Sequence, residues 1–170
     1  VPITLITQSR TSIGNTSSEI VQLMGKRYAV MQEPSKGDKI NEGIMKEITG
    51  GDPIQGRALF QEPVTFIPQF KLVVCTNTLF DIKSNDDGTW RRIRVCDFES
   101  KFLDNPNNDD KFPLSECPYQ YKIDPRIDEK FDKWAPILAS MLVEMTYKNL
   151  GIVKDCPRVM SSSDHYREGQ

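Results

Sequence analysis

Two nearly continuous apolar segments constrain the fold of this chain more than any other feature. RYAVMQ occupies residues 27–32 and KLVVCT occupies residues 71–76. Short apolar runs rich in β-branched residues are typical of strands, and the intervening sequence contains a helical pattern. Strands that alternate with helices predict an α/β fold with a parallel sheet. The 71–76 segment is so uniformly apolar that we expect a strand buried on both faces.

The remaining N-terminal pattern predicts short elements around these strands. A helix over 18–25 would be capped by Ser17 or Ser18, and 40–49 has apolar residues at helical spacing. IQGRALF and VTFIP predict a β-hairpin with its tip at 61–63. Further strands are expected at 1–7 and 90–98.

The C-terminal part has a different character. Residues 103–121 are rich in Asn, Asp and Pro, which predicts a long surface loop. Residues 127–149 predict a long helix with an apolar stripe that belongs to the core, and Pro136 should kink or break it. The polar end, 161–170, is expected to fray.

Polar residues follow the two apolar strands at the point where each strand ends. Glu33 follows the first strand and Asn77 follows the second, while Arg91 and Arg92 open the expected strand 90–98. Ligands of open α/β sheets bind beyond the carboxyl ends of the strands. A carboxylate there can order Mg²⁺ and polarise a water, an amide can hold that water, and arginine can stabilise a transferring phosphoryl group from a neighbouring subunit. The alternative is that these residues are ordinary turn residues, caps and solvated arginines.

A second candidate site is the expected hairpin. Lys46 and Arg57 lie close to it in sequence and could contact a nucleic-acid backbone through its phosphates. The predicted tip, 61–63, reads Gln-Glu-Pro and is not basic, so an ordinary surface hairpin remains the alternative. The net charge of −2 also provides no overall basic field, and a nucleic-acid contact would therefore be a local patch.

The remaining composition excludes several classes of site. The four cysteines are widely spaced without a C-x-x-C pair, which predicts free, buried thiols in a reducing compartment. His165 is the only histidine and lies near the C-terminal end, which argues against a Ser-His-Asp or Cys-His centre. No apolar run is long enough for a membrane span, and no secretory signal is present, so we expect neither a membrane anchor nor secretion.

Several blocks together resemble a known family. The blocks are GKRYAVMQEPSKGDKINEGIMKEITGGDPIQGRALF, FIPQFKLVVCTN and NDDGTWRRIRVCDF. In order and spacing they are similar to the superfamily 3 helicase module of viral primase-helicases, of the poxvirus and giant-virus type shared with satellite-phage and plasmid primases. The resemblance implies an AAA+-like P-loop ATPase core in a hexameric, ATP-driven DNA helicase that works on single-stranded DNA at viral replication forks.

The resemblance also implies roles for individual residues. Glu33 matches the acidic Walker B residue that serves Mg²⁺ and water, and Asn77 matches the sensor asparagine beside ATP. Arg91, and after it Arg92, match arginines that act across the subunit boundary. Lys46 and Arg57 match the motif that leads into the DNA-binding hairpin. Gln32 stands before Glu33, so this motif contains one carboxylate where an acidic pair is usual.

One family element has no counterpart here, because the chain contains no Gly-x-x-x-x-Gly-Lys-Ser/Thr loop. The Walker A strand and loop are expected upstream of Val1, with a primase domain possible further upstream. Residues 1–100 are then the C-terminal part of the ATPase core, 101–125 a surface loop, and 126–170 a helical segment with a polar tail. The isolated chain is expected to be inactive as an ATPase, and the parent to work in the host cytoplasm or a viral replication factory. Two alternatives stay open: a non-enzymatic nucleic-acid-binding or assembly module, and a remodelling ATPase that does not act on DNA.

Overall fold

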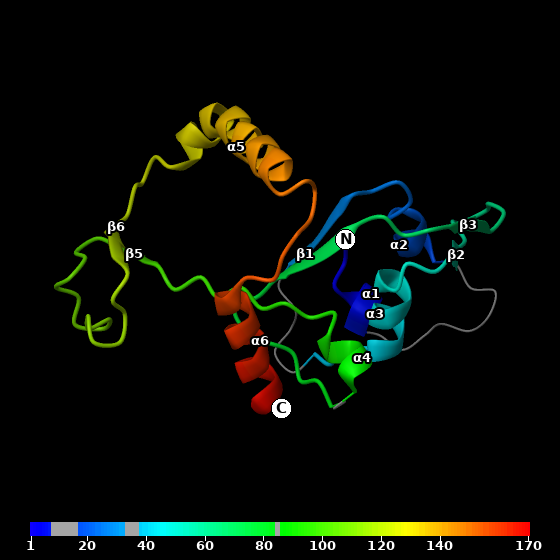
Figure 1. Ribbon diagram of the computed structural model, residues 1–170, viewed down its shortest axis with the longest axis horizontal. Coiled ribbons are helices and arrows are strands. Elements are labelled where there is room, and N and C mark those ends of the chain that lie inside the picture. The colour runs from blue at the N-terminus through cyan, green and yellow to red at the C-terminus, as the bar shows by residue number, and fades with distance from the viewer. Residues whose placement is uncertain (8–16, 33–37, 84–85) are drawn as a thin grey trace. The chain divides into compact units, whose positions relative to one another are not determined.

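The computed structural model describes residues 1–7, 17–32, 38–83 and 86–170 (Figure 1). These residues form two compact units, which are described separately. The first unit consists of Val1–Ile93 together with Tyr166–Gln170, and the second consists of Arg94–His165.

The first unit is built on a parallel pair of strands. β1 (Tyr28–Gln32) pairs with β4 (Lys71–Cys75) in a register that matches Tyr28 with Lys71 and Gln32 with Cys75. This pairing confirms the predicted parallel strands and the mixed α/β class. The prediction that β4 is buried on both faces is wrong, because its ends are exposed and its centre is half-buried. Among the described strands β4 pairs only with β1, so its other edge has no strand to cover it.

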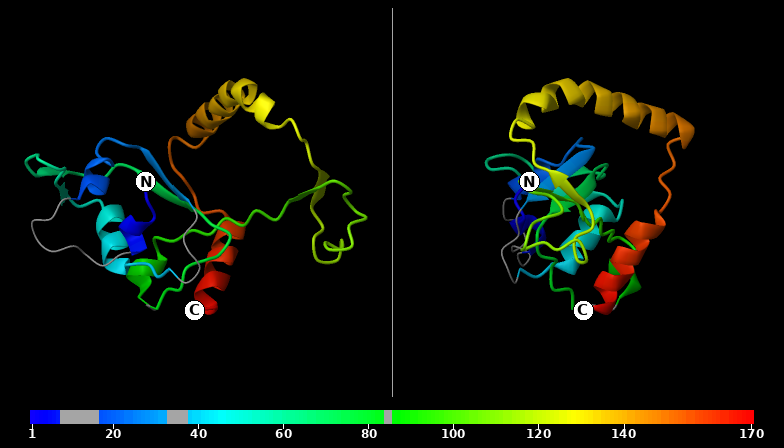
Figure 2. Two further views of the ribbon diagram at one scale, coloured as in Figure 1. Left: turned by 180° about the vertical axis from the view of Figure 1, so that it is seen from behind. Right: turned by 90° about the vertical axis from the view of Figure 1, so that its left-hand side faces the viewer.

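The first unit also contains short helices. The expected strand at 1–7 is wrong, since α1 (Thr4–Thr7) is a single helical turn closed by Ile6 N–H to the Ile3 carbonyl at 3.0 Å. Pro2 lies just before this helix, and its carbonyl accepts the Leu5 N–H at 3.3 Å. Ile6 is buried, and its carbonyl accepts the Asn41 N–H at 2.7 Å. Figure 2 shows α1 in blue beside α3 in cyan.

The helix α3 (Glu42–Thr49) confirms the periodicity at 40–49. The Asn41 side chain accepts the Ile44 N–H at 3.1 Å and so caps the first turn. Met45 and Ile48 are buried on one face. Glu42 and Lys46 therefore lie on the polar side of α3.

The predicted hairpin is confirmed, but its first strand ends at Gly56 and not at Phe60, so the loop is longer than the expected tip at 61–63. β2 (Ile54–Gly56) pairs antiparallel with β3 (Val64–Phe66), and residues 57–63 form the connecting hairpin loop. The helix α2 (Ser18–Val21) packs so closely on β2 that a Cβ at Gly56 would lie 2.9 Å from Val21 Cγ2. The cap expected from Ser17 is wrong, because its Oγ instead accepts the Arg57 N–H at 2.9 Å.

The predicted strand at 90–98 is wrong. Instead, α4 (Asp87–Trp90) is a helical turn, and the Asp86 side chain caps it by accepting the Gly88 N–H at 3.0 Å. The Asp86 carboxylate favours a helical turn directly after it, where the strand 90–98 was expected to begin. Trp90 is buried, which satisfies its apolar ring without a sheet.

The prediction that the end of the chain frays is wrong. It forms α6 (Pro157–Glu168), in which Ser163 and Tyr166 are buried. Tyr166 belongs to the first unit, where its hydroxyl donates to the Phe80 carbonyl at 2.5 Å. Its ring stands edge-on to Trp90 with 5.4 Å between centroids. These contacts hold a segment whose polar composition alone does not predict them.

In the second unit, β5 (Lys101–Leu103) and β6 (Gln120–Lys122) pair in parallel within the expected surface loop. α5 (Asp128–Lys148) confirms the long helix, and it continues through Pro136, so the helix is not broken in two there. Its apolar stripe was expected in the core, yet every residue of α5 is exposed. Periodicity shows which face is apolar and not what covers it.

The cysteines are free, as predicted, but their predicted burial is wrong. Cys75, Cys96 and Cys156 are exposed and Cys117 is half-buried. Across the described residues, no helix has the length and apolar content needed to cross a membrane.

Candidate functional site

The first candidate residues lie at the carboxyl ends of β1 and β4. Glu33 is outside the described residues, and the last residue before it, Gln32, pairs with Cys75. Asn77 follows Cys75 by two positions and is exposed. It is the central residue of a tight turn, in which the Thr78 N–H donates to Thr76 Oγ1 at 3.0 Å and that hydroxyl donates to the Thr78 carbonyl at 2.6 Å. The parallel register thus brings the two strand ends to one edge of the sheet.

The two adjacent arginines differ in their surroundings. Arg91 is the C-terminal cap residue of α4 and is exposed. Arg92 is half-buried, and its guanidinium donates to the Gly88 carbonyl of the same turn. Its backbone N–H donates to the Thr89 carbonyl at 3.1 Å. Arg92 is therefore bound into the turn and half-buried, and Arg91 is the more exposed of the two arginines.

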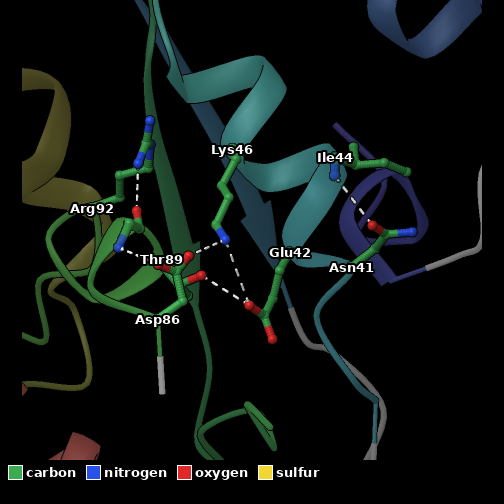
Figure 3. A network of polar contacts seen from close by, with 8 residues as sticks. Asn41, Glu42, Ile44, Lys46, Asp86, Thr89 and Arg92 are labelled. Carbon is green, nitrogen blue, oxygen red and sulfur yellow. Dashed lines mark hydrogen bonds and ion pairs between the residues drawn. The ribbon is translucent and has the colours of Figure 1, made fainter. Parts of the chain in front are cut away.

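Lys46 lies in a polar network that joins α3 to α4 (Figure 3). Its ammonium forms an ion pair with the Asp86 carboxylate and lies 4.0 Å from Glu42 Oε2. The hydrogen bond from Lys46 is the main cause that lowers the pKa of Asp86, and the Gly88 N–H adds to it. The fully buried Thr89 hydroxyl donates to Glu42 Oε2 at 2.9 Å.

The sequence reasoning did not identify three members of this network: Glu42, Asp86 and Thr89. One local signal was available, because Asp86 precedes Asp-Gly as N-terminal caps do. Another was the spacing of Glu42 and Lys46, which is that of an i,i+4 pair on one helix face. The pairing between Lys46 and Asp86 spans 40 positions and has no local signature.

Arg57 begins the hairpin loop and has an exposed side chain. Its backbone is held on both sides by Ser17, which accepts the Arg57 N–H and donates its own N–H to the Arg57 carbonyl at 2.8 Å. Its Nε donates to the Gln61 carbonyl at 3.0 Å, across the base of the loop. Arg57 thus belongs to an ordered loop, and its partners Ser17 and Gln61 differ from those of Lys46.

The arrangement groups the candidate residues into three places. One is the sheet edge with Asn77, another is the α3–α4 network with Lys46 and the two arginines, and the third is the hairpin loop with Arg57. Among the residues that the structure describes, no three His, Cys, Asp or Glu side chains gather as a metal site. Binding of Mg²⁺ by Glu33 is not tested by this and stays a prediction.

Comparison with known proteins finds relatives in large DNA viruses, although no family model matches the chain. A protein of Acanthamoeba polyphaga mimivirus named "Putative helicase" is 38% identical over 154 residues, which is 89% of this chain and 16% of that protein. The "Putative helicase" of Frog virus 3 is 36% identical over 142 residues, 81% of this chain and 14% of that protein. The chain is homologous to these viral proteins. The "Putative primase" of African swine fever virus is 28% identical over 173 aligned positions, 99% of this chain and 18% of that protein.

These relatives confirm the resemblance to viral primase-helicases. The chain spans less than a fifth of the length of each of the three. The similarity extends over both compact units, since the alignment to the swine fever virus protein covers 99% of the chain.

Proposed function

We propose that this chain is part of an ATP-dependent DNA helicase of superfamily 3, with an AAA+-like P-loop core that assembles as a hexameric ring. The observation that carries the proposal is the parallel register of β1 and β4. It ends both strands at one edge of the sheet, immediately before Glu33 and two positions before Asn77. The relatives named helicases and primases support the same class.

In this proposal the edge of the sheet is the hydrolytic site. The Glu33 carboxylate would hold Mg²⁺ and accept a hydrogen bond from the attacking water, and the exposed Asn77 amide would orient that water. Bound Mg²⁺ supplies neutralisation of the phosphate charge. The rest of the phosphate site comes from the Walker A loop that the resemblance implies upstream.

Of the two arginines, Arg91 is the better candidate to act on a neighbouring subunit. Its side chain is exposed, whereas the Arg92 guanidinium is bound to the Gly88 carbonyl and is half-buried. A trans-acting arginine must reach the ATP of the next subunit, where its charge stabilises the developing phosphoryl charge. Arg92 then serves to hold the turn that presents Arg91.

For the DNA, Arg57 is the better candidate than Lys46. Arg57 is exposed on the hairpin loop, while the Lys46 charge is already matched by Asp86 and Glu42. The proposed partner is single-stranded DNA at a replication fork, with a primase domain upstream. The proposed place of action is the host cytoplasm or a viral replication factory.

The test is ATP hydrolysis by the full-length protein with and without single-stranded DNA. We expect DNA to stimulate turnover and Glu33→Gln to abolish it. Arg91→Ala subunits mixed into wild-type protein should lower turnover more than in proportion to their share, because each mutant subunit disables its neighbour's site. Arg92→Ala is the matched control, and any loss of turnover that it causes should come from weaker folding of the turn.

Two outcomes would replace the proposal. Turnover that ignores DNA would indicate a remodelling ATPase. A folded protein that binds single-stranded DNA but never hydrolyses ATP would indicate a non-enzymatic binding or assembly module.

A further inference from the structure

The hairpin loop presents one large aromatic side chain to solvent. Phe60 is 94% exposed and has a backbone φ of 58°. A bulky residue in this left-handed region is uncommon and strained, and glycine would adopt it at lower cost. The ring is outside the core, so folding explains neither its exposure nor its strained backbone. Strain of this kind is a reason to look for a function.

Hydrogen bonds of the loop hold the backbone that carries the ring. The Gln61 N–H donates to the Ala58 carbonyl at 3.2 Å, which closes a turn with Leu59 and Phe60 as its central residues. Arg57 Nε binds the Gln61 carbonyl from the other side at 3.0 Å. The Phe60 ring is therefore presented by an ordered turn, whose backbone has little conformational entropy left to lose when a ligand binds.

An arginine stands at the start of the same turn. Its Nε–H binds Gln61, and the other N–H groups belong to an exposed guanidinium. Single-stranded nucleic acids are bound by this combination, in which a cation contacts the backbone phosphate and an aromatic ring stacks on a base. Glu62 lies in the loop as well, so the attraction of this loop for DNA cannot come from charge alone.

We propose that Phe60 stacks on a base of single-stranded DNA while Arg57 holds an adjoining phosphate. The choice of single-stranded DNA rests on the proposed function. The assignment of Phe60 rests on its exposure, its strained backbone and its place beside Arg57. Stacking is tolerant of sequence because every base has a flat face, which suits a protein that moves along a strand.

The test is the affinity of the full-length protein for a fluorescent oligothymidylate, measured by anisotropy without ATP. Phe60→Ala should weaken binding by about 5- to 150-fold, the range that the loss of one base–aromatic stack produces. Phe60→Tyr keeps the ring and should restore binding. Leu59→Ala is the matched control, because Leu59 is the neighbouring apolar residue of the turn, 61% exposed, and has no aromatic face.

The salt dependence separates the two contacts. Phe60→Ala should leave the slope of log Kd against log salt unchanged, since a stack releases no counterions. Arg57→Met should reduce that slope by about 0.7, which is one phosphate contact to a single strand. An oligonucleotide with abasic positions should bind the wild type more weakly and should not distinguish wild type from Phe60→Ala.

Phe60→Gly separates function from folding. It should lose affinity as Phe60→Ala does while its melting temperature stays equal or rises, because glycine relieves the positive φ. Equal losses from Leu59→Ala and Phe60→Ala, or a Phe60→Ala protein that binds like wild type, would overturn the stacking proposal. Such a result would leave the motor standing if DNA still stimulates ATP hydrolysis. Conversely, a protein that stacks DNA through Phe60 and hydrolyses no ATP would refute the motor alone.

Discussion

Tyr166→Phe tests how the C-terminal end of the chain holds the turn before Arg91. Tyr166 is 7% exposed, donates its hydroxyl to the Phe80 carbonyl at 2.5 Å, and packs its ring against Trp90. The substitution removes the hydroxyl and leaves a buried carbonyl without this donor, at a cost of about 1–3 kcal/mol. In a unit of this size each kcal/mol lowers the melting temperature by about 4–8 °C.

The same hydroxyl makes a prediction for alkaline pH. Burial, and after it the charge of Asp81, raises the pKa of Tyr166 to about 12. The folded state favours the neutral phenol, so its contribution is complete below the unfolded pKa of about 10 and is lost as the pH rises from there towards 12. The difference is about two pKa units, which corresponds to at most about 2–3 kcal/mol. Wild type should therefore lose its advantage over Tyr166→Phe in this interval.

The assay is urea unfolding followed by tryptophan fluorescence at pH 7 and at steps between pH 9 and 12. Tyr147→Phe is the matched control, because Tyr147 is 79% exposed and should leave the midpoint unchanged. Equal midpoints for Tyr166→Phe and wild type at pH 7 would refute the hydrogen bond. A difference that stays constant from pH 9 to 12 would refute the raised pKa.

Three further substitutions test the α3–α4 network and the glycine turn that follows it. Thr89→Val removes the hydroxyl that a fully buried residue donates to Glu42, and should cost about 1–3 kcal/mol in urea unfolding; an unchanged midpoint would contradict the buried bond. Asp86→Asn removes a carboxylate whose pKa is lowered by Lys46. A lowered pKa gives stability above about pH 4 that is lost as the pH falls through the folded value, so the variant should show a weaker acid dependence between pH 5 and 2, and an identical acid profile would contradict the ion pair. Gly51→Ala forces a side chain onto a φ of 87° and should cost about 1 kcal/mol, with equal melting temperatures as the contrary result.

The elements that the sequence predicted correctly are those with a periodic pattern of their own. β1 and β4 follow from short, nearly continuous apolar runs, α3 and α5 from helical spacing, and the hairpin from two short strand-like runs on either side of a polar tip. The failures lie where a contact distant in sequence decides the conformation. Residues 90–98 have the composition of a strand, yet Asp86 caps a helical turn and Trp90 is buried against Tyr166.

The candidate site shows the same division. The parallel pairing of β1 with β4 follows from the order of strands and helices, and it determines which edge carries Asn77. The partners of Lys46 do not follow, because Asp86 is 40 positions away in the sequence. The exposure of Phe60 and its positive φ were not predicted either, since an apolar residue at the end of an expected strand gives no sign of them.

Lys46 and Arg57, which the family motif treats alike, should therefore respond differently to substitution. A phosphate that bound Lys46 would have to replace the Asp86 carboxylate, an exchange of one anion for another that yields little net attraction. Arg57 requires no such exchange, because its guanidinium is exposed and its bond to Gln61 uses only Nε. We expect Lys46→Met to lower the melting temperature while leaving the salt slope of DNA binding unchanged. Arg57→Met should reduce the salt slope and leave the melting temperature unchanged. A reduced salt slope in Lys46→Met would show that a DNA phosphate displaces Asp86 from Lys46. Lys46 would then be a DNA-contacting residue and not only the structural link between α3 and the turn before Arg91.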